Sequence, residues 1–151
     1  YDHFELTTLN MAHSGVFGEI IHAEGAHIHN LEPYWRHYAD NWRLEYNQAH
    51  NGDVYATHGI GPNCQALNIH RGDKLDYLVS MSTKSINGAK LTKEIMGEDE
   101  CKQGDQINTL IRTHNGCTID MQHNVMTPRP YSRMYQLVGT EGYANKYPVA
   151  G

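Results

Sequence analysis

The feature that most constrains the fold is a turn signal, His114-Asn115-Gly116, which separates strand-like runs at residues 106–113 and 117–123. Asn-Gly between two such runs is a strong local signal for a β-hairpin, because this pair is favoured in tight hairpin turns. This part of the chain is therefore predicted to be antiparallel sheet.

Three more segments alternate in the way strands do: residues 18–30, 75–82 and 134–139. Residues 75–82 are predicted to be a half-buried strand, and residues 134–139 are expected to be the last strand, with a turn at residues 140–142. Residues 18–30 have no cleanly apolar face, which suits a strand with one face on helices and the other lining a site.

Two helices are expected. Residues 2–14 form the first, capped by Asp2, ended by Gly15 and carrying an approximate apolar stripe. The stripe consists of Phe4, Leu6, Leu9 and Met11. Residues 63–69 form the second helix, after a break in regular structure at Gly59, Gly61 and Pro62.

The order of these elements predicts a single α+β domain with an open, mainly antiparallel sheet and helices on one face. Its length of 151 residues fits one core. Residues 84–104 are charged and punctuated by glycine, and we expect them to form an exposed excursion.

Composition excludes several classes of partner. The net charge is −5, with 12 basic and 17 acidic residues, and the basic residues do not cluster as a nucleic-acid site requires. No run approaches the ~18 apolar residues of a membrane span. Three widely spaced cysteines, Cys64, Cys101 and Cys117, predict free and mostly buried thiols rather than disulfides or a zinc ribbon.

His27-Ile28-His29 is the one histidine pair whose spacing suits a metal, because residues i and i+2 of a strand share a face. No third ligand is evident, so no metal site is predicted. The face that carries both histidines is expected to be open.

Residues 31–52 read as an irregular connection rich in aromatic side chains. These are Tyr34, Trp35, Tyr38, Trp42 and Tyr46. Aromatic faces stack on the C–H bonds of sugars, so the segment either binds a sugar or covers the sheet as a packed lid without ligand contact.

The glycine-flanked segment at residues 52–62 brings Tyr55, Thr57 and His58 to the start of a helix. Hydroxyl groups, an imidazole and free backbone N–H groups at one place suit a polar ligand. The alternative is a capped turn in which His58 satisfies backbone groups.

Tyr55-Ala56-Thr57-His58, together with Thr127-Pro-Arg-Pro-Tyr-Ser-Arg133, resembles glycoside hydrolase family 109. Residues 1–11, 23–33, 68–74 and 134–148 agree with it as well. These are NAD-dependent α-N-acetylgalactosaminidases built on the Gfo/Idh/MocA oxidoreductase scaffold. The resemblance implies that NAD is held by a Rossmann domain upstream of Tyr1, and no glycine-rich dinucleotide fingerprint occurs in this chain.

The resemblance also implies a mechanism of oxidation, elimination, addition and reduction, in which the protein manages protons. His58 would be the principal acid/base residue, with Tyr55 and Tyr131 as further catalytic groups. These three residues would also bind the substrate, together with His27, Arg43, Ala56 and Thr57. His27 replaces a tyrosine of the family pattern, which makes strict specificity for N-acetylgalactosamine doubtful.

Two alternatives remain for function: a sugar oxidoreductase on the same scaffold, and a sugar-binding domain without catalysis. Besides the carbohydrate, the expected partner is a second copy of the protein that docks through the open sheet. Neither nucleic acid nor a membrane is expected as a partner. The ends of the chain suggest a fragment of a longer bacterial protein. The sequence does not assign that protein to a compartment, and export is one option.

Overall fold

The computed structural model describes residues 1–37 and 42–147. The helices are α1 (His3–His13), α2 (Glu32–Trp35), α3 (Trp42–Ala49), α4 (Thr57–Ala66) and α5 (Asn87–Met96). The strands are β1 (Ile20–Ile28), β2 (Leu75–Ser82), β3 (Ile107–Thr113), β4 (Thr118–Asn124), β5 (Tyr135–Gly139) and β6 (Tyr143–Lys146).

The strands form one open sheet in the order β2-β3-β4-β1-β5-β6. Only β1 and β4 run parallel, and the other four neighbouring pairs are antiparallel. The α+β class and the mainly antiparallel sheet are therefore confirmed, as is the hairpin at Asn115-Gly116, where Gly116 has a φ of 99°.

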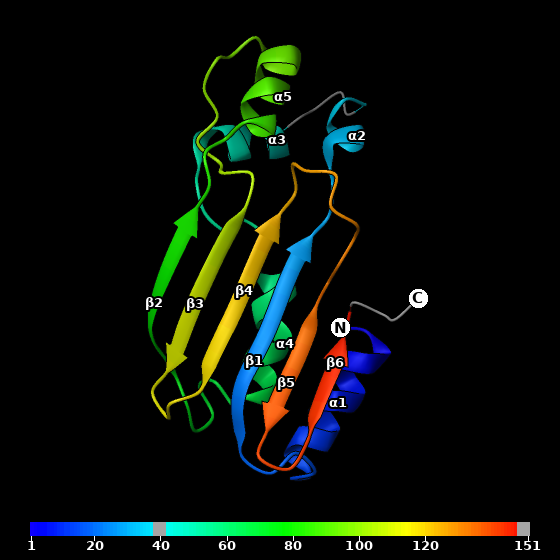
Figure 1. Ribbon diagram of the computed structural model, residues 1–151, viewed down its shortest axis with the longest axis vertical. Helices are drawn as coiled ribbons and strands as arrows, with labels where there is room; N and C mark the ends of the chain where they lie inside the picture. The colour runs from blue at the N-terminus through cyan, green and yellow to red at the C-terminus, as the bar shows by residue number, and fades with distance from the viewer. Residues whose placement is uncertain (38–41, 148–151) are drawn as a thin grey trace.

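The helices occupy two places (Figure 1). The helices α4 and α1 lie behind one face of the sheet, whereas α2, α3 and α5 gather beyond the end at which β1 and β4 terminate. The parallel pairing of β1 and β4 brings the carboxyl ends of two strands to this end of the sheet.

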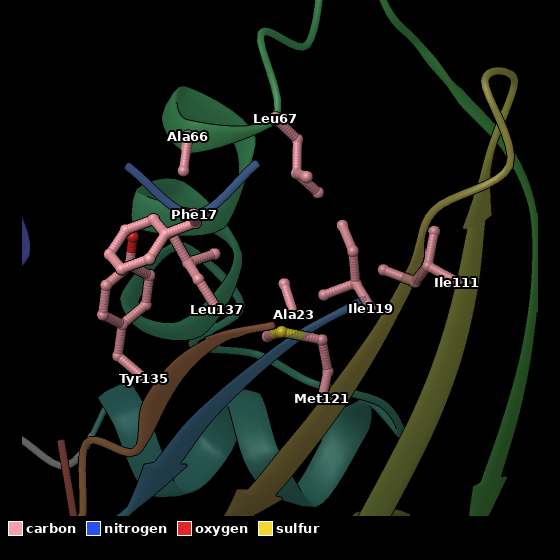
Figure 2. Close-up of a cluster of buried hydrophobic side chains, with 9 residues drawn as sticks. All are labelled: Phe17, Ala23, Ala66, Leu67, Ile111, Ile119, Met121, Tyr135 and Leu137. Carbon is pink, nitrogen blue, oxygen red and sulfur yellow. The ribbon is translucent and has the colours of Figure 1, made fainter. Parts of the chain in front are cut away.

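The main core lies between α4 and the covered face of the sheet (Figure 2). Helix α4 begins earlier than predicted, because Gly59, Gly61 and Pro62 lie within it instead of breaking the chain before it. A Cβ on Gly59 would lie 2.5 Å from Met121 Cε, and one on Gly25 would lie 2.5 Å from the Gly59 carbonyl oxygen. The glycines therefore allow a close approach of α4 to β1, a tertiary demand that outweighs local propensity.

Helix α1 has the predicted Asp2 cap, completed by Glu5 in a capping box. Its predicted apolar stripe is wrong in part, because Leu6 and Met11 are exposed and the buried residues are Glu5 and Thr8. Lys146 on β6 explains this face: its Nζ lies 2.7 Å from Glu5 Oε1 and 2.5 Å from Asp2 Oδ2. The ion pairs of Lys146 therefore tie α1 to the sheet alongside the remaining apolar contacts, in which Phe4 and Leu9 pack on the main core.

Three other predictions need correction. Residues 31–52 are not irregular, since α2 and α3 lie within them. Residues 84–104 contain α5, which contributes Leu91 to a second core with Trp35 and Leu44, so this segment is not simply exposed. Residues 134–139 are not the last strand, because β6 follows the turn at residues 140–142.

Strand β2 is exposed along all eight residues, although a half-buried strand was predicted. It is an edge strand that α4 does not reach, and no described helix packs on the opposite face of the sheet. That uncovered face, called the open face below, carries large apolar side chains that sequence register places together. They are Tyr77, Val79, Met81 and Leu110 on β2 and β3, whereas the exposed Tyr143 of the same face lies on β6 at the opposite edge of the sheet.

The cysteines are free thiols, as predicted, but each is half-buried rather than buried. Within residues 1–37 and 42–147, no helix is both long enough and apolar enough to cross a bilayer.

Candidate functional site

A pocket of about 270 Å³ opens where β1 ends beneath the cluster of short helices. Its lining comes from β1 and the residues just after it, from α2, from α3 and from the start of α4. The lining residues are His27, His29, Leu31, Tyr34, Trp35, Arg43, Tyr55 and His58. Four of the residues proposed from sequence, His27, Arg43, Tyr55 and His58, thus meet in one place.

His27 points to the covered face of the sheet, because Ala23, Gly25 and His27 alternate toward α4. The expectation of an open face at His27 is therefore wrong. Its ring stacks on His58 with centroids 4.5 Å apart and planes 17° apart, and the Tyr55 ring lies 4.9 Å away. His58 occupies the first turn of α4, so the helix position fixed by Gly25 and Gly59 also sets this stack.

Burial keeps these imidazoles neutral. His27 is 6% exposed, and burial, reinforced by His58 and other neighbouring positive groups, lowers its pKa to about 3. The pKa of His58 is also lowered, first by burial and then by Arg133. At neutral pH both rings are uncharged, and each can donate at one nitrogen and accept at the other.

Arg43 is the cationic member of the pocket lining. Its guanidinium carbon lies 4.3 Å from the centroid of the Trp42 ring, and the residue also borders a neighbouring cavity of about 160 Å³ with Tyr46 and Tyr55. Stacking on an aromatic ring holds the guanidinium plane while leaving its N–H groups able to donate to a ligand.

Tyr131 does not line this pocket. It borders a separate cavity of about 450 Å³, beside Arg129 and Tyr147, and meets the site through an edge-to-face contact with the His29 ring at 5.0 Å. His29 thus lines the first pocket and contacts a residue that lines the second cavity.

Ala56 and Thr57 also lie outside the pocket. Ala56 borders a third cavity of about 280 Å³, and Thr57 is exposed at the start of α4. Asp53 lines the same third cavity, where burial raises its pKa to about 6 although its Oδ1 accepts the Tyr55 backbone N–H at 3.1 Å.

Sequence reasoning missed several groups around the pocket. His123 stacks behind His27 and Tyr55. It follows Ile119 and Met121 at the buried positions of β4, and a histidine in such a series could have been recognised from sequence as a candidate site residue. Arg133 lowers the pKa of His27 and of His58, which local sequence gave no way to foresee. Among the aromatic candidates, Tyr34 and Trp35 line the pocket, whereas Tyr38 lies outside the described residues.

His27 and His29 are close, with ring centroids 6.1 Å apart. In the part of the chain that the structure describes, however, no group of three or more His, Cys, Asp or Glu side chains is arranged to hold a metal ion.

Comparison with known families gives one match that covers nearly the whole chain. Residues 1–149 match the family model described as glycosyl hydrolase 109, C-terminal domain. The chain is 65% identical to glycosyl hydrolase family 109 protein 1 of Bacteroides fragilis strain YCH46, covering 99% of this chain and 32% of the relative. It is 63% identical to the family 109 protein of Porphyromonas gingivalis strain W83, with the same coverage of both chains. The chain thus spans about a third of the length of these relatives.

Solved structures with the same fold include inositol dehydrogenases by name. One is a scyllo-inositol dehydrogenase from Lactobacillus casei with bound NAD(H) and scyllo-inositol, at a TM-score of 0.65 and 10% identity, covering 98% of this chain and 39% of that one. Another is a myo-inositol 2-dehydrogenase from Lactobacillus plantarum, at a TM-score of 0.64 and 11% identity, covering 97% and 39%. At such low identity the likeness establishes the fold alone, and this fold is consistent with the Gfo/Idh/MocA-type C-terminal domain expected from the resemblance.

Proposed function

We propose, from the premise that this chain belongs to glycosyl hydrolase family 109, that it is the substrate-binding and acid/base half of an NAD-dependent α-N-acetylgalactosaminidase. Family and fold together support a domain of the glycosidase or sugar-oxidoreductase type. The substrate, the cofactor and the roles of individual residues are the proposal.

The observation that carries it is the chemistry of the pocket lining. Among the described residues that line the pocket there is no Asp or Glu, whereas neutral imidazoles, a phenol and a guanidinium are present. Most glycosidases act through a pair of carboxylates, and NAD-dependent enzymes are an exception to that rule. A carboxylate-free pocket favours the exception.

The proposed roles follow from position and protonation. His58 is neutral at the pocket wall and can exchange a proton with a sugar carbon or with the leaving oxygen. The phenol of Tyr55 can hydrogen-bond a sugar hydroxyl, and Arg43 can donate to an acetamido carbonyl. Tyr131 would act from the adjoining cavity, on a part of the substrate that extends past His29.

NAD would supply reversible oxidation of the sugar ring, which this chain's residues do not provide. The sequence has no glycine-rich strand-to-helix turn to grip a dinucleotide. We therefore assign NAD binding mainly to a Rossmann domain in the remaining length of the parent protein, upstream of Tyr1, and leave to this chain the face that meets the sugar.

The test uses the full-length protein with NAD and an aryl α-N-acetylgalactosaminide. We expect hydrolysis, and we expect His58→Ala to lower kcat by about 10²–10⁴-fold, the usual contribution of a general acid or base. His50→Ala is the matched control: His50 is exposed and stacked on Tyr46 outside the pocket, and its loss should leave kcat unchanged. Inactivity of the wild-type protein on all α- and β-hexosaminides would refute the proposal.

The solved structures with the same fold favour a second candidate function, that of an NAD-dependent sugar dehydrogenase. The two candidates differ in their cofactor balance, because a dehydrogenase accumulates NADH in proportion to the product formed. Hydrolysis without net NADH supports the glycosidase. Sugar binding that survives His58→Ala, with no turnover in either protein, would instead indicate a non-catalytic sugar-binding domain.

The open face suggests a second copy of the protein as its partner. It carries Met81, which is 72% exposed, beside Val79 and Leu110, and a patch of this kind marks an interaction surface. Sedimentation velocity should show that Met81→Glu shifts the full-length protein toward monomer. Leu6→Glu, at an exposed apolar residue of α1 away from this face, should not, and equal behaviour of the two variants would exclude the open face.

A further inference from the structure

His123 lies behind the pocket, away from any position a substrate could touch. It occupies β4 in register with His27 on β1, so both side chains project from the covered face of the sheet. It is 1% exposed, and its ring centroid lies 6.2 Å from that of His27 and 5.8 Å from that of Tyr55. The two rings that it supports both line the pocket.

Gln103 determines which nitrogen of His123 carries the proton. The Gln103 amide nitrogen donates to the Gly52 carbonyl oxygen at 2.9 Å, which fixes the orientation of the amide group. The same nitrogen lies 3.4 Å from His123 Nδ1. It also lies 3.5 Å from the Gly104 carbonyl oxygen. An amide N–H directed at Nδ1 requires a lone pair there, so this contact favours the neutral tautomer with its proton on Nε2.

Gln103 also joins three parts of the site. Its segment is held to α3 by two backbone hydrogen bonds, from Lys102 N to Gln48 O at 2.9 Å and from Gln103 N to Asn47 O at 3.2 Å. Helix α3 carries Arg43, Gly52 precedes the Tyr55 loop, and His123 belongs to the sheet. The backbone of this segment and the side chain of Gln103 therefore together link the elements that supply the guanidinium, the phenol and the imidazole.

This arrangement leaves polar atoms unsatisfied in the core. His123 Nε2, Gln103 Oε1 and His27 Nδ1 are buried and have no hydrogen-bond partner among the described residues. Each such atom lowers the stability of the fold, and apolar side chains of similar shape would avoid that loss. Destabilising polar groups kept directly behind a pocket are typical of functional sites.

We propose that Gln103 and His123 are positioning residues of the pocket: Gln103 holds His123 in one tautomer, and the His123 ring in turn fixes the rings of His27 and Tyr55. The expected effect on kcat rests on the proposed function. The predicted tautomer and ring positions do not depend on it. It gives a role in the site to the segment before β3, which sequence alone placed on the surface.

The experiment compares three variants of the full-length protein. Gln103→Met removes the amide donor at similar size, and His123→Phe keeps a ring in the stack but removes its nitrogens. Thr92→Val is the control, because Thr92 is equally buried in the same excursion and donates to the Gly88 carbonyl oxygen at 2.9 Å, away from the pocket. We expect the first two to lower kcat at least about tenfold with little change in KM, as displaced catalytic groups do.

Nitrogen-15 spectra of labelled histidine test the inference without any turnover. The wild-type protein should show His123 protonated at Nε2, Gln103→Met should lose that single tautomer, and the His27 ring signals should move in both site variants but not in Thr92→Val. A wild-type His123 protonated at Nδ1, or unmoved His27 signals, overturns the inference, and so does a kcat within about twofold of wild type in a folded site variant. If Gln103→Met does not fold, His123→Phe decides. If the wild-type protein turns over no sugar, the proposed function fails and the spectra alone test the positioning roles. The two failures can therefore be told apart.

Discussion

Acidification should destabilise this chain through two buried imidazoles, that of His27 in the pocket lining and that of His123 behind it. In the folded state, burial lowers the pKa of His27 to about 3 and that of His123 to about 4, from an ordinary value of 6.5. Below pH 6.5 the unfolded chain therefore binds protons that the folded chain excludes. Stability from these residues is complete above that pH and is lost as the pH falls toward the folded pKa values.

The magnitude follows from the span of pH crossed. Between about pH 7.5 and about pH 5, each histidine removes about 2 kcal/mol from the free energy of unfolding. Asp53 acts in the opposite sense, because burial raises its folded pKa to about 6 and the folded state then binds the extra proton. It restores about 1.4 kcal/mol over the same range, which leaves a net loss of about 2.5 kcal/mol.

Urea denaturation of the 151-residue chain at the two pH values measures this loss. The difference between variants is the sharper quantity, since titrating groups common to both cancel. His123→Phe should lose only about 0.5 kcal/mol on acidification, and Asp53→Asn about 4 kcal/mol. An equal pH dependence of wild type and His123→Phe would show that His123 is not held neutral by burial.

Three other predictions follow from the packing and from the missing dinucleotide fingerprint. Gly25→Ala should destabilise the chain by about 3 kcal/mol or more in urea denaturation, because its Cβ would lie 2.5 Å from the Gly59 carbonyl oxygen, whereas Gly61→Ala has room and should stay within about 1 kcal/mol of wild type. Lys146→Met should cost about 3–5 kcal/mol by leaving the carboxylate of the 2% exposed Glu5 uncompensated. Adding Glu5→Gln should recover part of that loss, and no recovery would refute the ion-pair explanation. Calorimetry on the 151-residue chain alone should show no tight NAD binding and at most sugar binding of about −4 kcal/mol, while micromolar NAD affinity would place the cofactor site in this half of the protein.

Local sequence determined the elements whose signals are complete within a few residues. The Asn115-Gly116 hairpin, the Asp2 cap of α1 and the strands at β1, β2 and β5 were all predicted, because turn chemistry, capping and alternation act between near neighbours. The family resemblance added most of the candidate site, and four of those residues meet in one pocket.

Tertiary structure decided the rest. Gly59, Gly61 and Pro62 read locally as breakers, yet they lie in α4 because a helix without side chains on that face can approach Gly25. The parallel pairing of β1 with β4 sets His27 beside His123 across nearly a hundred residues of chain, and Gln103 reaches His123 from a segment that looked merely polar. No local pattern encodes such contacts, because they depend on which strand lies next to which and on what each face then buries.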